Sequence, residues 1–222
     1  MPAASALIVW GGWKGHEPEQ VAGILADCLR ETGFGVEVAD TLDAFLDGER
    51  LEGLDLIVPI WTMGQITKEQ RAPVLAAVEG GTGLAGCHGG MCDAFRNDVE
   101  WQFMTGGQWV AHPGNQDVTY GVTITDREHA ITRGIEDFEV TSEQYYVHVD
   151  PANHVLATTR FPTVDGPHAA NGPVDVPVSW TRMWGKGRVF YSSLGHVAST
   201  AREEGPLSLM KRGMLWAARA LD

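Results

Sequence analysis

Three histidines lie in glycine-containing segments whose composition could support chemistry. His16 ends the run Gly11-Gly12-Trp13-Lys14-Gly15-His16, His88 lies within Cys87-His88-Gly89-Gly90, and His196 follows Leu194-Gly195. Imidazole groups titrate near neutral pH and ligate divalent metal ions, so they suit proton transfer or metal binding. Each segment comes directly after a predicted strand. We therefore expect the three histidines to meet at one edge of a sheet.

The segment around His88 has the composition of a sharp strand-to-helix turn, which needs small residues on both sides of its centre. A turn centred on Cys87 would put a thiol at a helix start, where its pKa falls, and would favour a Cys-dependent amidohydrolase. A turn centred on His88 would present an imidazole for acid–base work or for a metal. The residues of Gly86-Cys87-His88-Gly89-Gly90 alone leave both centres open.

Two further candidates lie in the middle of the chain. His112 precedes Pro113, which favours an extended backbone from which the ring could enter a cleft. Glu143 lies beside Tyr145 and Tyr146, where its carboxylate could act as a general acid or base, ligate a metal, or simply be a solvated group at a strand end.

Tryptophans in loop-like positions indicate a ligand class. Trp13, Trp61 and Trp109 each lie in or beside a segment that follows a predicted strand or precedes His112. An exposed aromatic face suits stacking on a sugar ring. These side chains are consistent with a saccharide-binding cleft.

The elements that would position these residues alternate in the first half of the chain. Strands are predicted at 6–10, 36–39, 54–60 and 82–86, and helices at 21–29 and 67–78, the second with a capping-box signal from Thr67 and Gln70. Such alternation with short connections predicts a mostly parallel sheet with helices on both faces. In that fold, ligands bind at the carboxyl ends of the strands.

The second half of the chain changes to short β-like runs. We expect extra strands at 118–125, 138–141, 154–159, 176–181 and 188–192, a loop at 161–174, and a last amphipathic helix that starts at Pro206. Without a repeat or a linker, residues 1–222 are predicted to form a single α/β domain.

Composition excludes several classes of partner. The formal net charge of −13 disfavours nucleic acid and membrane surfaces, both of which are anionic. Three cysteines, an odd number, do not make a disulfide framework, which favours a reducing compartment. Residues 1–5 lack the basic and apolar regions of an export signal, and there is no long apolar run for a membrane span. We expect a cytoplasmic protein.

The chain resembles the ThuA-like (trehalose utilisation) family, which has the flavodoxin-like α/β fold of the class I glutamine amidotransferase-like superfamily. The matching segments are Gly11-Gly12 with His16, 54–60, 66–71, 83–90, 105–113, 142–145, 177–182, 185–191, Gly195-His196 and 212–218. The family pattern at the turn is Gly-x-His with x usually aliphatic, which favours His88 as its centre and makes Cys87 a departure. Ser142 stands where the family usually has Asp, before the retained Glu143.

The resemblance implies a carbohydrate-metabolism protein. We expect an enzyme of lyase, isomerase or hydrolase type that acts on a small saccharide or keto-sugar. The expected catalytic residues, which are also the candidates for a divalent metal such as zinc, are His88, His112, Glu143 and His196. The expected substrate-binding residues are Gly12, Trp13, His16, Trp61, Trp109 and Tyr145. The alternatives are a non-catalytic sugar-binding or scaffold subunit of a sugar oxidoreductase, and a Cys-dependent amidohydrolase. A homo-oligomer stays open.

Overall fold

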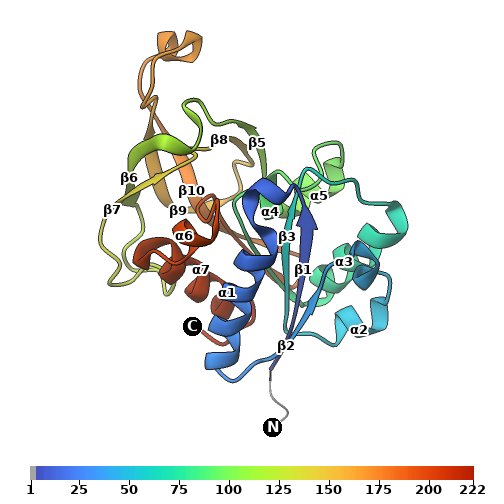
Figure 1. Cartoon of the computed structure of the whole chain (residues 1–222). Coiled ribbons are helices and arrows are strands. Elements are labelled where there is room, and N and C mark those ends of the chain that lie inside the picture. The colour runs from blue at the N-terminus through green and yellow to red at the C-terminus, as the bar shows by residue number, and fades with distance from the viewer. Residues whose placement is uncertain (1–3) are drawn as a thin grey trace.

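The computed structural model describes residues 4–222 and contains a nine-stranded mixed sheet and a separate two-stranded ribbon (Figure 1). The strands are β1 (Ser5–Gly12), β2 (Gly35–Ala39), β3 (Leu56–Thr62), β4 (Gly83–Cys87), β5 (Gly107–Ala111), β6 (Val118–Ile124), β7 (Phe138–Ser142), β8 (Tyr146–Val149), β9 (His154–Phe161), β10 (Val174–Trp184) and β11 (Gly187–Ser192). The helices are α1 (Pro18–Glu31), α2 (Gly48–Glu52), α3 (Lys68–Gly80), α4 (Gly89–Cys92), α5 (Val99–Thr105), α6 (Ala198–Ala201) and α7 (Glu204–Ala217). Single 3₁₀ turns are η1 (Lys14–His16), η2 (Leu42–Phe45), η3 (Asn115–Asp117) and η4 (Pro167–Asn171).

The large sheet has the strand order β2-β1-β3-β4-β11-β10-β9-β6-β7. The pairs from β2 to β11 are parallel, and those from β11 to β7 are antiparallel. This arrangement confirms the predicted parallel sheet with additional strands from the second half of the chain.

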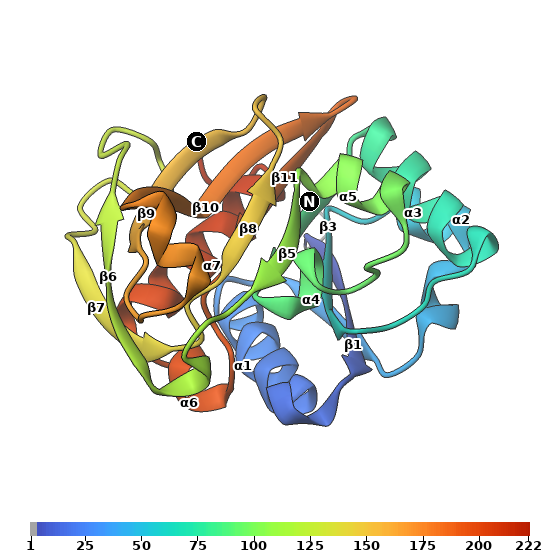
Figure 2. The ribbon, with the colours of Figure 1, turned by 90° about the horizontal axis from the view of Figure 1, so that it is seen from above.

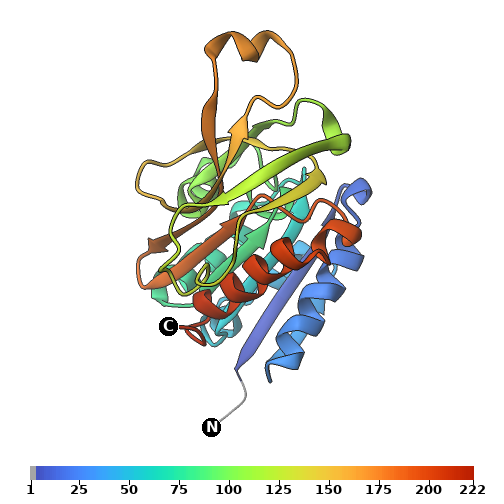
Figure 3. The same ribbon diagram turned by 90° about the vertical axis from the view of Figure 1, so that its left-hand side faces the viewer.

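Two hydrophobic cores lie on opposite faces of the sheet, as the apolar run in β1 predicts. Ala6 and Ile8 of β1 pack in one core, whereas Leu7 and Val9 pack in the other. The first core receives α1 and α7, which lie next to one another (Figure 3). The second receives α2, α3 and α5. Residues of β1 therefore contribute to both cores.

Helix boundaries follow the sequence signals with one correction. The Thr67 hydroxyl accepts from the Gln70 amide and the Gln70 side chain accepts from the Thr67 amide, which confirms the capping box of α3. The last helix begins at Glu204 rather than at Pro206. Pro206 is its third residue, where the helix still needs no backbone N–H.

The ribbon of β5 and β8 was not predicted, because these strands are short and lie beside the sheet rather than in it. In Figure 2 the ribbon crosses the sheet on the side where the parallel strands end. The predicted loop at 161–174 contains η4, since β9 runs to Phe161 and β10 begins at Val174. Residues 1–3 of the segment considered for an export signal lie outside the described residues. Within residues 4–222, no helix has both the length and the apolar character to span a bilayer.

Candidate functional site

His88 is the centre of the turn between β4 and α4. Its backbone has φ 50° and ψ −132°, a strained combination for a residue other than glycine. The turn is held from β11, because the His88 amide donates to the Ser192 carbonyl at 2.7 Å and the Tyr191 hydroxyl donates to the His88 carbonyl at 2.9 Å. A Cβ on Gly89 would lie 2.6 Å from the Thr62 hydroxyl oxygen, so the glycine after His88 is a steric requirement.

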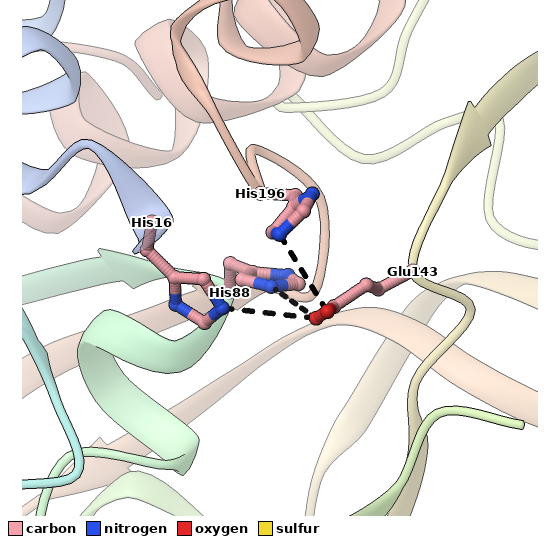
Figure 4. Close-up of side chains that lie close together, drawn as sticks. All are labelled: His16, His88, Glu143 and His196. Atoms are coloured by element: carbon pink, nitrogen blue, oxygen red, sulfur yellow. Dashed lines mark hydrogen bonds and ion pairs between the residues drawn. The ribbon is translucent and has the colours of Figure 1, made fainter. Parts of the chain in front are cut away.

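Four buried side chains meet at the carboxyl ends of the parallel strands (Figure 4). They are His16, His88, Glu143 and His196, which we call the histidine–glutamate cluster, and one ligating atom from each lies within 4.8 Å of all the others. The Nε2 atoms of His88 and His16 lie 3.1 Å and 3.7 Å from Glu143 Oε2. The Nε2 of His196 lies 3.5 Å from Glu143 Oε1. The carboxylate therefore stands at the centre of three imidazoles.

Each cluster residue comes from a different connection. His16 ends the turn η1 after β1, His88 follows β4, and His196 follows β11. Glu143 lies between β7 and β8, and its carbonyl accepts from the Tyr120 hydroxyl of β6 at 3.1 Å. The parallel strands thus supply the histidines, and the antiparallel extension supplies the acid.

The second nitrogen of two imidazoles is held by a neighbour. His88 Nδ1 donates to the Ser193 carbonyl at 2.8 Å, because a carbonyl can only accept. In a neutral ring, His88 Nε2 then carries no proton, and its lone pair is directed at Glu143. His16 Nδ1 lies 3.0 Å from the Thr62 hydroxyl, which can accept its proton in the same way. A partner on Nδ1 that fixes the tautomer is typical of metal-ligating histidines.

Burial and mutual proximity set the charges in the cluster. Burial, together with the neighbouring His16 and His196, lowers the pKa of His88 to about 3 against the opposing effect of Glu143. Burial also lowers the pKa of His196. Burial on its own would raise the pKa of Glu143, but contacts with His16 and His88 hold it well below its usual range. At neutral pH the Glu143 carboxylate therefore faces a neutral His88 imidazole.

His112 and Tyr145 border the cluster. His112 Nε2 lies 3.8 Å from Glu143 Oε1, and its side chain is 29% exposed. From sequence, His112 is among the metal candidates and His16 among the substrate-binding residues, whereas in the structure His16 is in the close group and His112 lies outside it. Tyr145 stacks on His88 with ring centroids 4.0 Å apart and is buried. The Tyr145 ring therefore covers one face of the His88 imidazole.

The tryptophans differ in what they offer a ligand. Trp13 is 48% exposed and packs edge-on against His16. Trp61 is half-buried, and Gly11 and Gly64 lie against its ring, since a Cβ on either would come within 2.4 Å of it. The ring of Trp109 is covered by the Arg96 guanidinium at 4.3 Å. Trp13 is therefore the tryptophan of this group that presents a free face.

The pairing of β1 with β3 requires a glycine at position 12. It has φ 79°, and a Cβ there would lie 2.0 Å from the Thr62 carbonyl oxygen. Gly12 pairs with Thr62 in the register of β1 and β3, so a larger residue would separate the two strand ends.

Cys87 does not have the properties of a nucleophile. Its thiol is buried, and burial raises its pKa to about 12. A thiolate is the reactive form, so the lowered pKa expected for a turn centred on Cys87 is wrong. The positive φ belongs to His88, one residue later.

Two residues beside the cluster are not singled out in the sequence analysis. Thr62 contacts His16 from the end of β3, and Glu17 follows His16 in the chain. Neither type is unusual at a strand end or a helix start. The structure identifies them, because Thr62 contacts the His16 side chain and Glu17 contacts the backbone of Ala198 in the loop after His196.

Comparisons with known proteins agree with this architecture. A family model described as ThuA, trehalose utilisation, matches residues 5–217. No match to the chain was found among curated proteins. A ThuA-like protein of Parabacteroides merdae superimposes with a TM-score of 0.73 at 19% identity, over 99% of this chain and 91% of that one. A ThuA-like protein of Bacteroides uniformis gives 0.74 at 17% identity, over 98% and 93%.

A β-galactosidase of Rahnella sp. R3 also contains a similar fold. Its TM-score is 0.62 at 16% identity, and the match covers 99% of this chain but 31% of the galactosidase. At these identities the structural matches show the fold alone. They confirm the predicted α/β architecture with a parallel centre and added antiparallel strands.

Proposed function

The chain belongs to the ThuA (trehalose utilisation) family, and we propose that it is an enzyme that acts on a small saccharide or keto-sugar at the histidine–glutamate cluster, with a divalent metal ion held by that cluster. The family gives the carbohydrate context. The metal and the catalysis are argued from the side chains. A cytoplasmic location is part of the same proposal.

The observation that carries the proposal is the pairing of His88 with Glu143. His88 Nδ1 donates to Ser193, so the Nε2 that faces Glu143 Oε2 at 3.1 Å has no proton while the ring is neutral. Two acceptors at this distance repel one another unless a cation lies between them. A proton on His88 or on Glu143 would serve, but burial lowers the pKa of His88 to about 3, and the pKa of Glu143 is held well below its usual range. A metal ion satisfies both atoms at neutral pH.

The donor set fits a first-row divalent ion. Ligands about 2.0–2.2 Å from zinc in a tetrahedral site lie roughly 3.3–3.6 Å from one another. The three cluster nitrogens lie 3.1 Å, 3.5 Å and 3.7 Å from the nearest Glu143 oxygen. Three imidazoles and one carboxylate suit zinc, nickel or manganese. The cluster residues would hold the ion, which would act as a Lewis acid toward a carbonyl or hydroxyl oxygen of the substrate.

His112 is the residue placed to exchange a proton with substrate. Its side chain is 29% exposed, whereas the exposed fraction of the cluster side chains is between 3% and 8%. Histidine is the most frequent general acid or base in enzymes. At this position His112 would remove a proton from the carbon beside a sugar carbonyl, or donate one to a glycosidic oxygen. Trp13, with its free face beside His16, would bind the sugar ring by stacking.

The amidohydrolase alternative lacks a reactive thiol, because Cys87 is buried and its pKa is raised. The sugar-binding subunit differs from the proposed enzyme in needing no proton transfer. A panel of disaccharides and their keto derivatives, incubated with the metal-loaded protein and followed by NMR, distinguishes the two. The enzyme should convert one of them, and His112→Gln should slow that turnover by about 100-fold or more while sugar binding persists. Binding of a saccharide without conversion, unchanged in His112→Gln, would contradict catalysis.

A further inference from the structure

The side chain of Glu17 makes no capping hydrogen bond to the helix that it precedes. Glu17 is the residue before α1, with φ 46° and ψ 48° in the left-handed region. A residue at this position usually has an extended backbone and caps its own helix through a short polar side chain. No side chain caps α1. The Glu17 carboxylate instead accepts the backbone N–H of Ala198 at 3.0 Å.

This hydrogen bond joins the loops of two cluster residues. Glu17 follows His16 directly, and Ala198 comes two residues after His196. Ala198 is the first residue of α6, and the preceding Val197 has no polar side chain to cap it. Glu17 therefore satisfies a helix-terminal donor that the other loop cannot satisfy, across a separation of 181 residues.

The backbone of Glu17 is fixed on both sides. Its amide donates to the Lys14 carbonyl at 3.0 Å, and its carbonyl accepts from Val21 at 3.0 Å. Glycine would adopt the left-handed conformation at lower cost. The local backbone thus gives no reason for a glutamate here, whereas the contact with Ala198 does.

We propose that Glu17 is a positioning residue that fixes the separation between His16 and His196 and so preorganises the cluster for its metal. The imidazoles of these two histidines lie edge to face with centroids 5.0 Å apart. Their loops leave different strands, β1 and β11, which are not neighbours in the sheet. The inference rests on the proposed metal site and concerns what holds two of its ligands at the required distance.

Two substitutions remove the bond from opposite ends. Glu17→Gly removes the carboxylate and accepts φ 46° without strain. Ala198→Pro removes the donor N–H at the first position of a helix, where proline is well tolerated. Loss of a group that supports a ligand typically costs about 10–100-fold in metal affinity, and we expect each variant to weaken zinc binding in this range. The double variant should bind zinc no more weakly than the single variant with the lower zinc affinity, because both changes remove the same hydrogen bond.

Glu17→Gln is the conservative variant, and Glu19→Gln is the matched control. Glutamine keeps an oxygen that accepts from Ala198, so Glu17→Gln should lose less than about tenfold. Glu19 is exposed in the first turn of α1, so its substitution makes the same change of charge without touching the bond. It should leave zinc affinity unchanged.

The test is zinc affinity by competition with a chromophoric chelator, together with thermal unfolding of the metal-free proteins. Weakened binding in Glu17→Gly and Ala198→Pro, with unfolding temperatures close to wild type, supports a positioning role. Wild-type affinity in both would overturn it and leave the metal site standing. Loss of affinity in step with a lowered unfolding temperature in both, or a double variant that loses the product of the two effects, would also overturn it. A wild-type protein that binds no zinc would overturn the metal proposal itself, and this inference with it.

Discussion

His88 Nε2 lies 3.1 Å from Glu143 Oε2 while His88 Nδ1 donates to the Ser193 carbonyl 2.8 Å away. A neutral ring cannot donate from both nitrogens, so an unprotonated nitrogen faces a carboxylate oxygen. His88 follows β4 and Glu143 lies in the connection of β7 to β8, so the two residues come from opposite halves of the sheet. The fold therefore brings two hydrogen-bond acceptors together without a proton to share.

Thr62 orients His16, and its hydroxyl should matter more than its size. Thr62→Val removes the oxygen 3.0 Å from His16 Nδ1 at nearly constant volume. We expect zinc affinity to fall by about 10–100-fold. Thr62→Ser keeps the hydroxyl and should restore most of the affinity. The measurement is zinc competition with a chelator, and equal affinities for the valine and serine variants would contradict the role.

Acid should destabilise the metal-free protein partly through His88. Its folded pKa of about 3 lies below the ordinary histidine value of 6.5, so the unfolded chain binds more protons as pH falls through 6.5. The stability associated with neutral His88 is thus present above pH 6.5 and is lost progressively below it. The contribution between pH 7.5 and 5.5 is about 1 kcal/mol. Glu143, whose pKa is also lowered, changes stability in the same direction at lower pH.

Urea unfolding at these two pH values checks the prediction. His88→Gln should show a smaller loss of unfolding free energy on acidification than wild type, by about 1 kcal/mol. His148→Gln is the control, because His148 is exposed on β8. A loss in His88→Gln as large as in wild type would show that the pKa of His88 does not differ between the folded and the unfolded chain.

Gly89 should be intolerant of a methyl group. A Cβ there would lie 2.6 Å from the Thr62 hydroxyl oxygen and 3.0 Å from His16 Nδ1. Gly89→Ala should lower the unfolding free energy by about 1–3 kcal/mol and weaken metal binding, because the turn between β4 and α4 and the side chain of His16 must separate. The control is Gly23→Ala in α1, where a Cβ meets nothing within 4 Å and should stabilise the helix by about 0.5–1 kcal/mol. Similar stabilities for both variants in urea would be inconsistent with this packing.

Trp13 should act on substrate binding alone. Its ring is 48% exposed and is not among the cluster ligands. Trp13→Ala should raise KM for the converted saccharide by about tenfold with kcat nearly unchanged, which is the signature of a uniform binding contact. Trp184→Ala, at the far end of β10, is the control. A fall in kcat at constant KM would indicate that Trp13 takes part in the reaction itself.

The fold could be predicted in large part from local patterns. The apolar run of β1 and the capping signal at Thr67 are properties of neighbouring residues, so they are visible in sequence. The ribbon of β5 and β8 could not be predicted in this way. Its pairing joins Gly107 to Val149 across the intervening strands β6 and β7, and neither strand has a strong pattern of its own.

The site shows the same division. His88 could be placed because small residues surround it at a strand end, and the resemblance to a family resolved its position against Cys87. His16 could be assigned to the same edge, but not to the inner group, because spacing does not say which side of the cleft a loop side chain occupies. Glu17 and Thr62 act through contacts between distant segments, and such contacts have no local signature.

The most direct test of the account is the metal content of the purified, tag-free protein. Wild type should contain about one equivalent of a divalent first-row metal, and His88→Ala and His196→Ala should each lose it, because structural ligands contribute jointly to affinity. His148→Ala, which changes an exposed histidine, should retain it. Less than about a tenth of an equivalent in wild type, both as purified and after dialysis against zinc, would contradict a metal site in the histidine–glutamate cluster.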